Sequence, residues 1–407
     1  MKQLAYAKTS IPNTLRPSHT IESLYGQGYI YNPKLYSEDY SHFSSDVLSL
    51  EALTGRELSV AGDAPVICHV GTVTEPALRL LRKAGLTVPA SLYTYSSEED
   101  YLALLHQLEY LNKKVIFQYP HPAEKASPEL HWVDPDVHAY LCDKRSIPDL
   151  VPAGHYPQRK MMSLAEILQE KPQLPLVLKS GDGRPTSGGC GVMLVHDEHQ
   201  LNSVDETFCD LSKIIVEEHI EYDENISVHY AVNPDGEIRF LGRSEQIVNQ
   251  EGCFRGSWIS VDIDDKIAPI AETGYWVMKR IADTGYVGVA GFDVLVKGDS
   301  FYFIDLNVRF NASTCGLLLY RDIQRNYGKS VMRLCNLEWT SSFDDLVPVV
   351  ENYMDSGKFV PIGFLDADYV PCGSSTSKAV GLVIAHSTEE AETTLTQMAL
   401  DGLHPRE

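Results

Sequence analysis

The sequence has no excess of basic residues and no apolar run long enough to cross a bilayer. Its 407 residues include 34 Lys and Arg against 56 Asp and Glu, which gives a formal net charge of −22. A chain this acidic lacks the basic face that nucleic-acid-binding proteins use, so we expect no nucleic-acid partner. The lack of a long apolar run predicts no membrane-spanning segment.

Paired cysteines are also missing. The 8 cysteines are scattered singly, without a C-x-x-C pair or a histidine at zinc-finger spacing. The first twenty residues contain no apolar segment typical of secretory signals, so we expect a cytoplasmic protein with reduced cysteines. Cys190 lies in a glycine-rich stretch and could be a nucleophile, but a core or incidental cysteine is favoured because no neighbouring charge would favour its thiolate.

The composition that remains is that of a globular protein, 43% hydrophobic and 22% charged, with room for two or three domains. From residue 65 the pattern is that of an α/β protein. An apolar strand at 65–70 precedes two amphipathic helices, at 74–86 and 96–112, and a strand at 113–120. This order predicts a parallel sheet. The Tyr-rich first sixty residues are interpreted as a packed extension of this unit, which we assign to residues 1–135.

The rest of the chain has a different pattern, rich in paired strands. Strands are predicted at both ends of 176–195 and in 225–248 and 286–311, with a helix at 267–285 between the last two. Residues 358–402 read as strands followed by one capped helix. We therefore predict an α/β (α+β) fold with a second domain at 136–345 and a C-terminal extension at 346–407.

A Gly/Ser/Thr-rich stretch interrupts the strand pair at 176–195. It is either a surface hairpin or a loop whose unobstructed backbone N–H groups surround an anion. Lys179 ends the first strand and precedes Gly188 and Gly189, so the stretch is not a Walker A loop, in which lysine follows the glycines and a helix comes next.

A row of polar residues lies within the predicted strand pair at 286–311. Asp293 lies in the first strand, and Asp305, Asn307 and Arg309 alternate along the second. Such alternation is either an ordinary solvent face or a row of oxygen ligands for Mg²⁺, with an arginine that can face a carboxylate or a phosphoryl group.

Taken together, these parts resemble the ATP-grasp superfamily of carboxylate–amine and carboxylate–thiol ligases, over residues 136 to 340. The segment LCDK resembles its first nucleotide-binding lysine, and PLVLKSGDGRPTSGGCGV its strand, lysine and glycine-rich flap. VEEHI resembles the adenine-binding hinge, and FDVLV…FIDLNVR the paired metal-binding strands. The resemblance implies an ATP-grasp fold with an N-terminal Rossmann-like pre-grasp domain.

The resemblance also implies a set of site residues. ATP contacts are implied for Lys144, Lys179, Gly188, Gly189, Glu217, Glu218, Ile220 and, at the ribose, Glu224 or Asn225. Asp293, Asp305 and Asn307 are the implied ligands of two Mg²⁺ ions, for which Mn²⁺ can substitute. The family usually has Glu where this chain has Asp305, which alters how the carboxylate can bridge two metals.

The implied reaction activates an amino-acid carboxylate as an acyl phosphate and passes it to an acceptor. Arg309, with Arg243 or Arg255, would steady the acyl phosphate, although a surface ion pair is the other interpretation of the latter two. Resemblance to natural-product ligases of the pheganomycin and butirosin type implies glutamate as substrate and an acyl-carrier-protein thiol or an amine as acceptor, in antibiotic biosynthesis.

Several alternatives stay open at this point. The enzyme could form a free amide bond between amino acids, or the fold could be a non-catalytic nucleotide-binding protein. A homodimer is one expected assembly. The basic residues Lys144, Arg145, Arg159 and Lys160 form either a docking patch for an acidic carrier protein or a set of solvated charges beside the ATP site.

Overall fold

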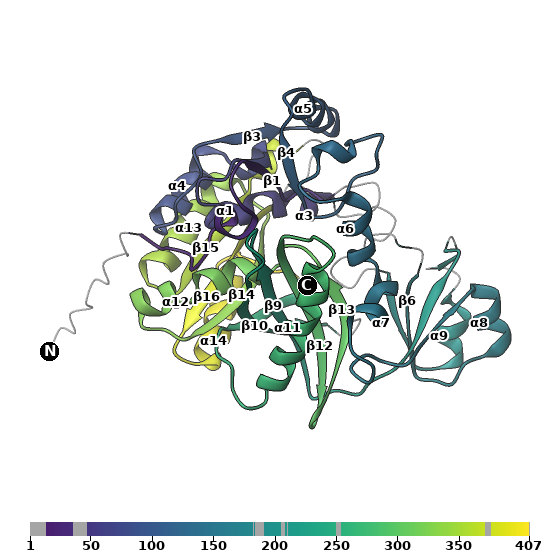
Figure 1. Ribbon diagram of the computed structural model, residues 1–407. Helices are drawn as coiled ribbons and strands as arrows, with labels where there is room; N and C mark the ends of the chain where they lie inside the picture. The colour runs from purple at the N-terminus through teal and green to yellow at the C-terminus, as the bar shows by residue number, and fades with distance from the viewer. Residues whose placement is uncertain are drawn as a thin grey trace, which may run out of the picture.

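The computed structural model describes residues 14–35, 47–181, 183, 191–204, 208–209, 211–249, 254–370 and 376–406. In these ranges the strands form three sheets, and the sheet that contains β6 lies with α8 and α9 in a lobe beside α7 and β13 (Figure 1). No helix in the described ranges combines the length and the apolar character that crossing a membrane requires.

The first sheet is parallel, with the order β3-β2-β1-β4. Its strands are β1 (Tyr29–Asn32), β2 (Val66–His69), β3 (Leu92–Tyr95) and β4 (Lys114–Phe117). This confirms the predicted parallel sheet, but the Tyr-rich segment is more than an extension, because it supplies β1 between β2 and β4. The two predicted helices are present as α4 (Glu75–Lys83) and α5 (Glu98–Tyr110). Helix α5 begins where the Ser97 side chain accepts a hydrogen bond from the Asp100 backbone N–H.

The largest sheet has nine strands in the described residues and is antiparallel throughout, in the order β13-β12-β9-β10-β11-β14-β16-β15 with β17 beside β14. Its strands are β9 (Glu224–Val232), β10 (Ile238–Val248), β11 (Phe254–Ser260), β12 (Gly288–Lys297), β13 (Ser300–Asn307), β14 (Val331–Trp339), β15 (Phe359–Leu365), β16 (Ser377–Ala385) and β17 (His404–Pro405). The strands after residue 345 thus extend the same sheet that holds β12 and β13. The predicted domain boundaries at 135 and 345 stay a prediction.

The third sheet is antiparallel, in the order β5-β8-β6-β7. It consists of β5 (Arg159–Met162), β6 (Leu176–Ser180), β7 (Val192–Val195) and β8 (Ile214–Glu218), with helices α8 (Leu164–Glu170) and α9 (Glu198–Asn202). Leu178 and Val216 on one face join the core that contains Ile167 of α8 and Leu201 of α9. Lys179 and Glu217 therefore point to the other face, because neighbouring strand residues alternate.

The remaining helices cover the sheets. They are α1 (Ile21–Tyr25), α3 (Val47–Ala52), α6 (Pro135–Cys142), α7 (Ile147–Leu150), α11 (Ala268–Ala282), α12 (Thr314–Tyr327), α13 (Phe343–Asp355) and α14 (Thr388–Leu400). Helix α11 packs Val277 and Met278 in one core with Phe292 and Phe303 of the β12–β13 hairpin. Each fully buried phenylalanine contributes about 1.5–3 kcal/mol through removal of apolar surface from water. This packing fixes which face of the hairpin stays available for polar side chains.

Candidate functional site

The polar face of the β12–β13 hairpin is built around a β-bulge. Asp293 pairs with Asp305, but the next pair is Val294 with Phe303, so Ile304 is the extra residue on β13. Strict alternation would have sent Asp305 into the core beside Phe303. The bulge turns it to the same face as Asp293 and leaves the Ile304 carbonyl outside the ladder, where it accepts a hydrogen bond from Lys179 Nζ at 2.8 Å.

The two carboxylates have different environments. Asp293 accepts hydrogen bonds from Gln246 Nε2 at 2.7 Å and from Asn307 Nδ2 at 3.1 Å. Burial, together with the nearby Asp305 charge, raises the pKa of Asp293 to about 6. Asp305 accepts from Lys144 Nζ at 2.7 Å. Burial alone would raise the pKa of Asp305, but Lys144 and then Lys179 and Arg309 lower it below its ordinary value.

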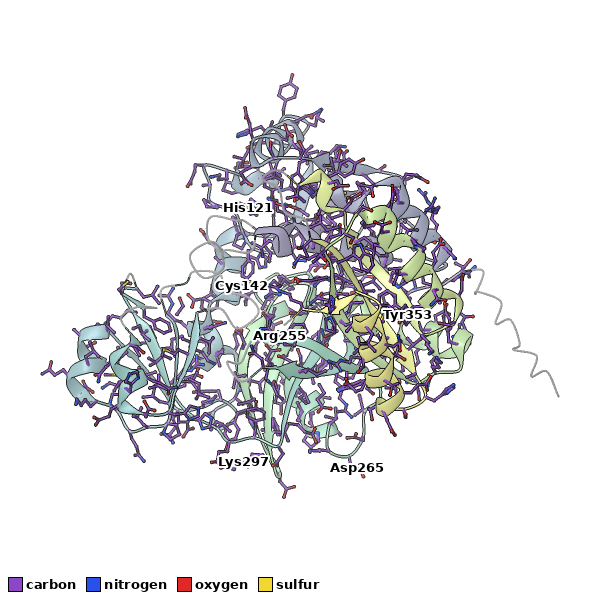
Figure 2. All side chains as sticks on the ribbon, turned by 180° about the vertical axis from the view of Figure 1, so that it is seen from behind. His121, Cys142, Arg255, Asp265, Lys297 and Tyr353 are labelled. Atoms are coloured by element: carbon purple, nitrogen blue, oxygen red, sulfur yellow. The ribbon has the colours of Figure 1, made fainter. Side chains whose placement is uncertain are left out.

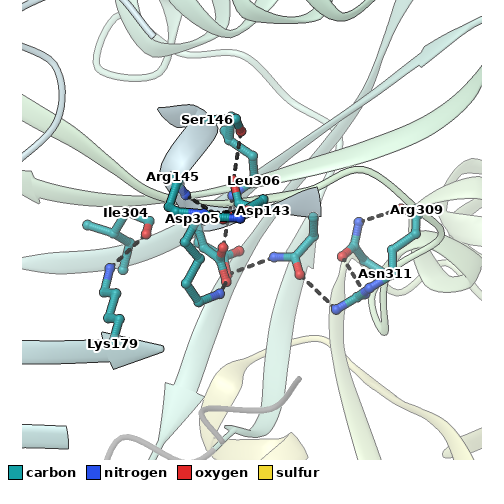
Figure 3. A network of polar contacts seen from close by, with 12 residues as sticks. Asp143, Arg145, Ser146, Lys179, Ile304, Asp305, Leu306, Arg309 and Asn311 are labelled. Carbon is teal, nitrogen blue, oxygen red and sulfur yellow. Dashed lines mark hydrogen bonds and ion pairs between the residues drawn. The ribbon is translucent and has the colours of Figure 1, made fainter. Parts of the chain in front are cut away.

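Arg309 continues this row just beyond the end of β13 and is buried. Its guanidinium donates to Asn307 Oδ1 at 2.7 Å and to Asn311 Oδ1 at 3.3 Å (Figure 3). Its Cζ lies 5.1 Å from the centre of the Tyr119 ring. The sequence thus placed Asp305, Asn307 and Arg309 together correctly, although through a bulge rather than through simple alternation.

The donor set suits a hard divalent cation. Two carboxylates lie in register and one amide lies beside them, and oxygen ligands of this kind hold Mg²⁺ in proteins. In the described residues no group of three or more His, Cys, Asp or Glu side chains could hold a metal, so the amide would be the third ligand. Asn307 here turns its NH₂ toward Asp293 and its oxygen toward Arg309, so it would have to rotate to act as one.

Lys179 belongs to a buried ion-pair group between β13 and the third sheet (β5-β8-β6-β7), which we call the small sheet. Its Nζ lies 2.7 Å from Glu217 Oε2, and Arg159 binds the other oxygen of the same carboxylate. Arg159 also donates to the Lys144 carbonyl at 2.6 Å. Burial lowers the pKa of Lys179 despite the Glu217 charge. Lys144, which contacts Asp305, and Lys179, which contacts the neighbouring Ile304 carbonyl, are therefore brought to the same part of β13.

The predicted hinge residues lie along one edge of this region. The Glu218 side chain accepts from the Gln158 backbone N–H at 2.8 Å, and Ile220 is half-buried just beyond β8. Glu224 accepts from Lys266 Nζ at 2.5 Å. Among the described residues Asn225 Oδ1 is buried and has no hydrogen-bond partner, so of the two ribose candidates it is the one with a buried, unused acceptor.

The remaining predicted residues are less closely associated with the charged cluster, which consists of Lys144, Lys179, Asp293, Asp305 and Arg309. Arg243 forms an ion pair with Asp264 at 3.2 Å, and alternation along β10 places it on the face opposite Gln246. Arg255 lies near the centre of the molecule in Figure 2 and has no polar contact with another residue in the described part of the chain. Gly188, Gly189 and Cys190 lie outside the described residues.

The basic residues near the site do not form an open patch. Lys144 and Arg159 are each about nine-tenths buried and paired with Asp305 and Glu217. The exposed pair is also neutralised, since Arg145 contacts Asp143 and Lys160 contacts Glu170 at 2.8 Å. The docking patch considered from the sequence is therefore not supported by this arrangement.

Two family models match the chain and bear the same activity in their descriptions. Residues 157–307 match "L-aspartate--L-methionine ligase, ATP grasp", and residues 20–139 match "L-aspartate--L-methionine ligase N-terminal domain". The first match spans Lys179, the hinge and the carboxylate pair described above, and Lys144 lies between the two matches. The chain belongs to the ATP-grasp superfamily. As a member of that superfamily it is an ATP-dependent ligase.

Solved structures agree with an ATP-grasp fold. An N5-carboxyaminoimidazole synthetase from Staphylococcus aureus, complexed with ADP, matches with a TM-score of 0.58 at 11% identity, covering 95% of this chain and 99% of that one. An L-amino acid ligase from Bacillus licheniformis matches with a TM-score of 0.54 at 13% identity, covering 93% and 98%. A biotin carboxylase from Campylobacter jejuni matches with a TM-score of 0.56 at 16% identity, covering 93% and 92%. The ATP-grasp fold thus extends over nearly the whole chain.

Some residues that contact the candidate site were not found from the sequence. Gln246 holds Asp293, and Asn311 holds Arg309. Arg159 was noted only as part of a basic patch, yet it binds Glu217. Nothing marked Gln246 in the sequence, because β10 also contains Arg239, Arg243, Ser244 and Glu245, and the partner of Gln246 lies 47 residues away.

Proposed function

We propose that this ATP-grasp ligase joins the carboxylate of L-aspartate to the amine of L-methionine, with consumption of ATP in the presence of Mg²⁺. The observation that carries the proposal is that both family models bearing this activity match, and that the first of them covers Lys179, Asp293 and Asp305. The superfamily relation supports a carboxylate–amine ligase, and the descriptions of the models supply the two amino acids.

The proposed chemistry proceeds in two steps. The aspartate carboxylate attacks the γ-phosphorus of ATP, the bond to the bridging oxygen breaks, and ADP leaves with an acyl phosphate formed. The methionine amine then attacks the acyl carbon, loses a proton and expels inorganic phosphate, which leaves an amide. Phosphoryl transfer requires mainly positioning and charge neutralisation, so lysines, arginines and metal ligands suffice.

Named residues have distinct proposed roles in these steps. Lys179 binds the phosphates, and Mg²⁺ held by Asp293 and Asp305 would neutralise their developing charge. Lys144 now occupies the Asp305 carboxylate at 2.7 Å, so it would release that oxygen to a metal and turn toward phosphate. Arg309, fixed by Asn307 and Asn311, would face the acyl phosphate.

The glutamate and carrier-protein proposal is the second candidate. It rests on the sequence resemblance to natural-product ligases, and it predicts transfer to a phosphopantetheine thiol. The pairing of Lys144, Arg145, Arg159 and Lys160 with acidic side chains removes the docking surface that favoured it. Transfer to the amine of a free amino acid is therefore the function that the site supports best.

One experiment separates these functions. The purified protein is incubated with ATP and Mg²⁺, with aspartate or glutamate as donor, and with methionine or a phosphopantetheinylated carrier protein as acceptor. Mass spectrometry should detect aspartyl-methionine, with one ADP released per amide formed. Loading of the carrier protein with glutamate, in the absence of any dipeptide, would contradict the proposal. Asp305→Asn serves as the inactive control.

A further inference from the structure

A cavity of about 700 Å³ lies beside the charged cluster, between the segment after β4 and helix α6. Its lining comes mainly from residues 119–136, with Ala139 and Cys142 of α6 and with Gly183. Figure 2 labels His121 and Cys142, two of these lining residues. Its volume falls within the range of about 300–1,000 Å³ that is typical of small-ligand pockets.

The histidines of the lining present ring faces rather than free polar atoms. His121 Nε2 contacts the Tyr101 hydroxyl at 2.5 Å, and His121 Nδ1 contacts the Tyr119 carbonyl at 3.3 Å. His131 Nδ1 donates to the Ser127 carbonyl at 2.9 Å, and its Nε2 accepts from the His121 backbone N–H at 3.4 Å. Burial lowers the pKa of both rings, that of His121 to about 3, so both are neutral at physiological pH.

Two further polar side chains of the lining have hydrogen-bond partners. Trp132 Nε1 donates to the Val287 carbonyl at 2.9 Å, and Lys114 Nζ donates to the His131 carbonyl at 3.1 Å. Burial raises the pKa of the Cys142 thiol to about 12, so it stays protonated. Prolines and alanines make up much of the rest of the wall. Part of the interior is thus formed by ring faces and apolar side chains, while Glu129, Asp134 and Asp136 make the rest of it acidic.

One end of the cavity reaches the charged cluster. Tyr119 lines the cavity, and its ring centre lies 5.1 Å from Arg309 Cζ. Cys142 also lines it and precedes Lys144, whose ammonium binds Asp305. An amino acid could therefore place its side chain in the cavity and its backbone polar groups at the cluster.

We infer that this cavity binds the side chain of the acceptor amino acid and accepts an unbranched chain such as that of methionine. The inference rests on the proposed function and assigns one of its two substrates to a place. The donor aspartate is disfavoured there, because its carboxylate would lose water and would meet Glu129, Asp134 and Asp136 against one ammonium, that of Lys114.

Ala139→Phe tests the inference. Ala139 is exposed and lines the cavity from α6, so a phenylalanine there can fill it without displacing the core. Ala165→Phe is the matched control, because Ala165 is an exposed alanine on α8 away from the cavity. In Ala139→Phe the KM for methionine as acceptor should rise by about tenfold or more relative to the KM for free alanine as acceptor. The KM values for aspartate and ATP should be unchanged. An unchanged KM for methionine, or an equal rise for all substrates, would overturn the inference.

A binding measurement separates this inference from the proposed function. Norleucine, aspartate and serine are titrated separately into the protein with a non-hydrolysable ATP analogue, and tryptophan fluorescence is followed because Trp132 lines the cavity. Norleucine alone should bind saturably to wild type and Ala165→Phe, with binding lost in Ala139→Phe. If no dipeptide forms but this pattern holds, the proposed function fails and the cavity assignment stands. If norleucine binds Ala139→Phe as it binds wild type, or does not bind wild type, the assignment fails.

Discussion

Replacing Glu217 with glutamine should loosen the small sheet far more than removing its partner Lys179. Glu217 is 2% exposed and is the shared acid for Lys179 and Arg159. Glu217→Gln leaves two buried cations without a counter-charge. Lys179→Met leaves Glu217 still paired with Arg159, so no buried charge becomes isolated.

The magnitudes follow from that difference. Removing one partner of a buried ion pair costs about 3–5 kcal/mol, because the charge left behind is uncompensated. We therefore expect Glu217→Gln to cost at least about 3 kcal/mol of local stability, since Lys179 and Arg159 share this one carboxylate. For Lys179→Met the main loss is the hydrogen bond to the Ile304 carbonyl, of about 0.5–3 kcal/mol.

Hydrogen exchange measured by mass spectrometry reads the effect where it occurs. The four tryptophans lie at 132, 258, 276 and 339, all outside the small sheet, so tryptophan fluorescence would miss a local change. A loss of about 3 kcal/mol corresponds to roughly 150-fold faster exchange of protected amides in β6 and β8. The β14 amides serve as an internal reference and should be unaffected.

The reverse order of effects would refute this reasoning. If Lys179→Met accelerated exchange in β6 and β8 as much as Glu217→Gln does, Arg159 would not be an effective second partner of the carboxylate. The double variant provides a further check. Removing Lys179 along with the Glu217 charge should cost less than Glu217→Gln alone, because one of the two stranded cations is then gone.

Asp305→Asn should reduce ADP release below detection while circular dichroism stays unchanged, and near wild-type release at millimolar Mg²⁺ would exclude Asp305 as a metal ligand. Arg309→Lys should lower kcat by about 100-fold with little change in the KM for ATP, because the two-armed contact with its neighbouring amides is lost; a raised KM for ATP alone would place Arg309 on the nucleotide instead. Burial lowers the pKa of both His121 and His229 to about 3, so below pH ~6.5 the unfolded chain binds more protons than the folded one and stability falls. From pH 7 to pH 5 each ring should cost about 2 kcal/mol, and His229→Gln should flatten the dependence of Tm on pH relative to wild type.

Much of the fold could be predicted because its signals are local. The hairpin of β9 and β10, the strands β12 and β13, and helices α4, α5, α11 and α14 all follow from apolar spacing, caps and turn residues within a few positions. The central strand β1 could not be recognised, because its short segment YIYN lies among tyrosines and its neighbours in the sheet come from residues 66–69 and 114–117.

The residues of the candidate site could be proposed from the sequence, but their arrangement in space could not. The order of Lys179, the acidic hinge and Asp305 gave the resemblance, but the bulge at Ile304 depends on pairing with β12 and leaves no mark in the sequence. The contact of Gln246 with Asp293 likewise depends on sheet order. The sequence also could not show that Lys144 and Arg159 are buried, because their acidic partners lie 161 and 58 residues away.

The position of β16 has a consequence for how the protein is made. Strand β14 pairs along its whole length with β16, and β17 at residues 404–405 pairs with β14 as well. While the ribosome is still translating, β14 therefore has an open edge, and the apolar side chains it shares with β16 are uncovered. The sheet that carries Asp293 and Asp305 is completed only after residues 377–405 have been released. We expect newly made chains to need chaperone protection until then, and premature termination after residue 345 to yield aggregates rather than a smaller enzyme.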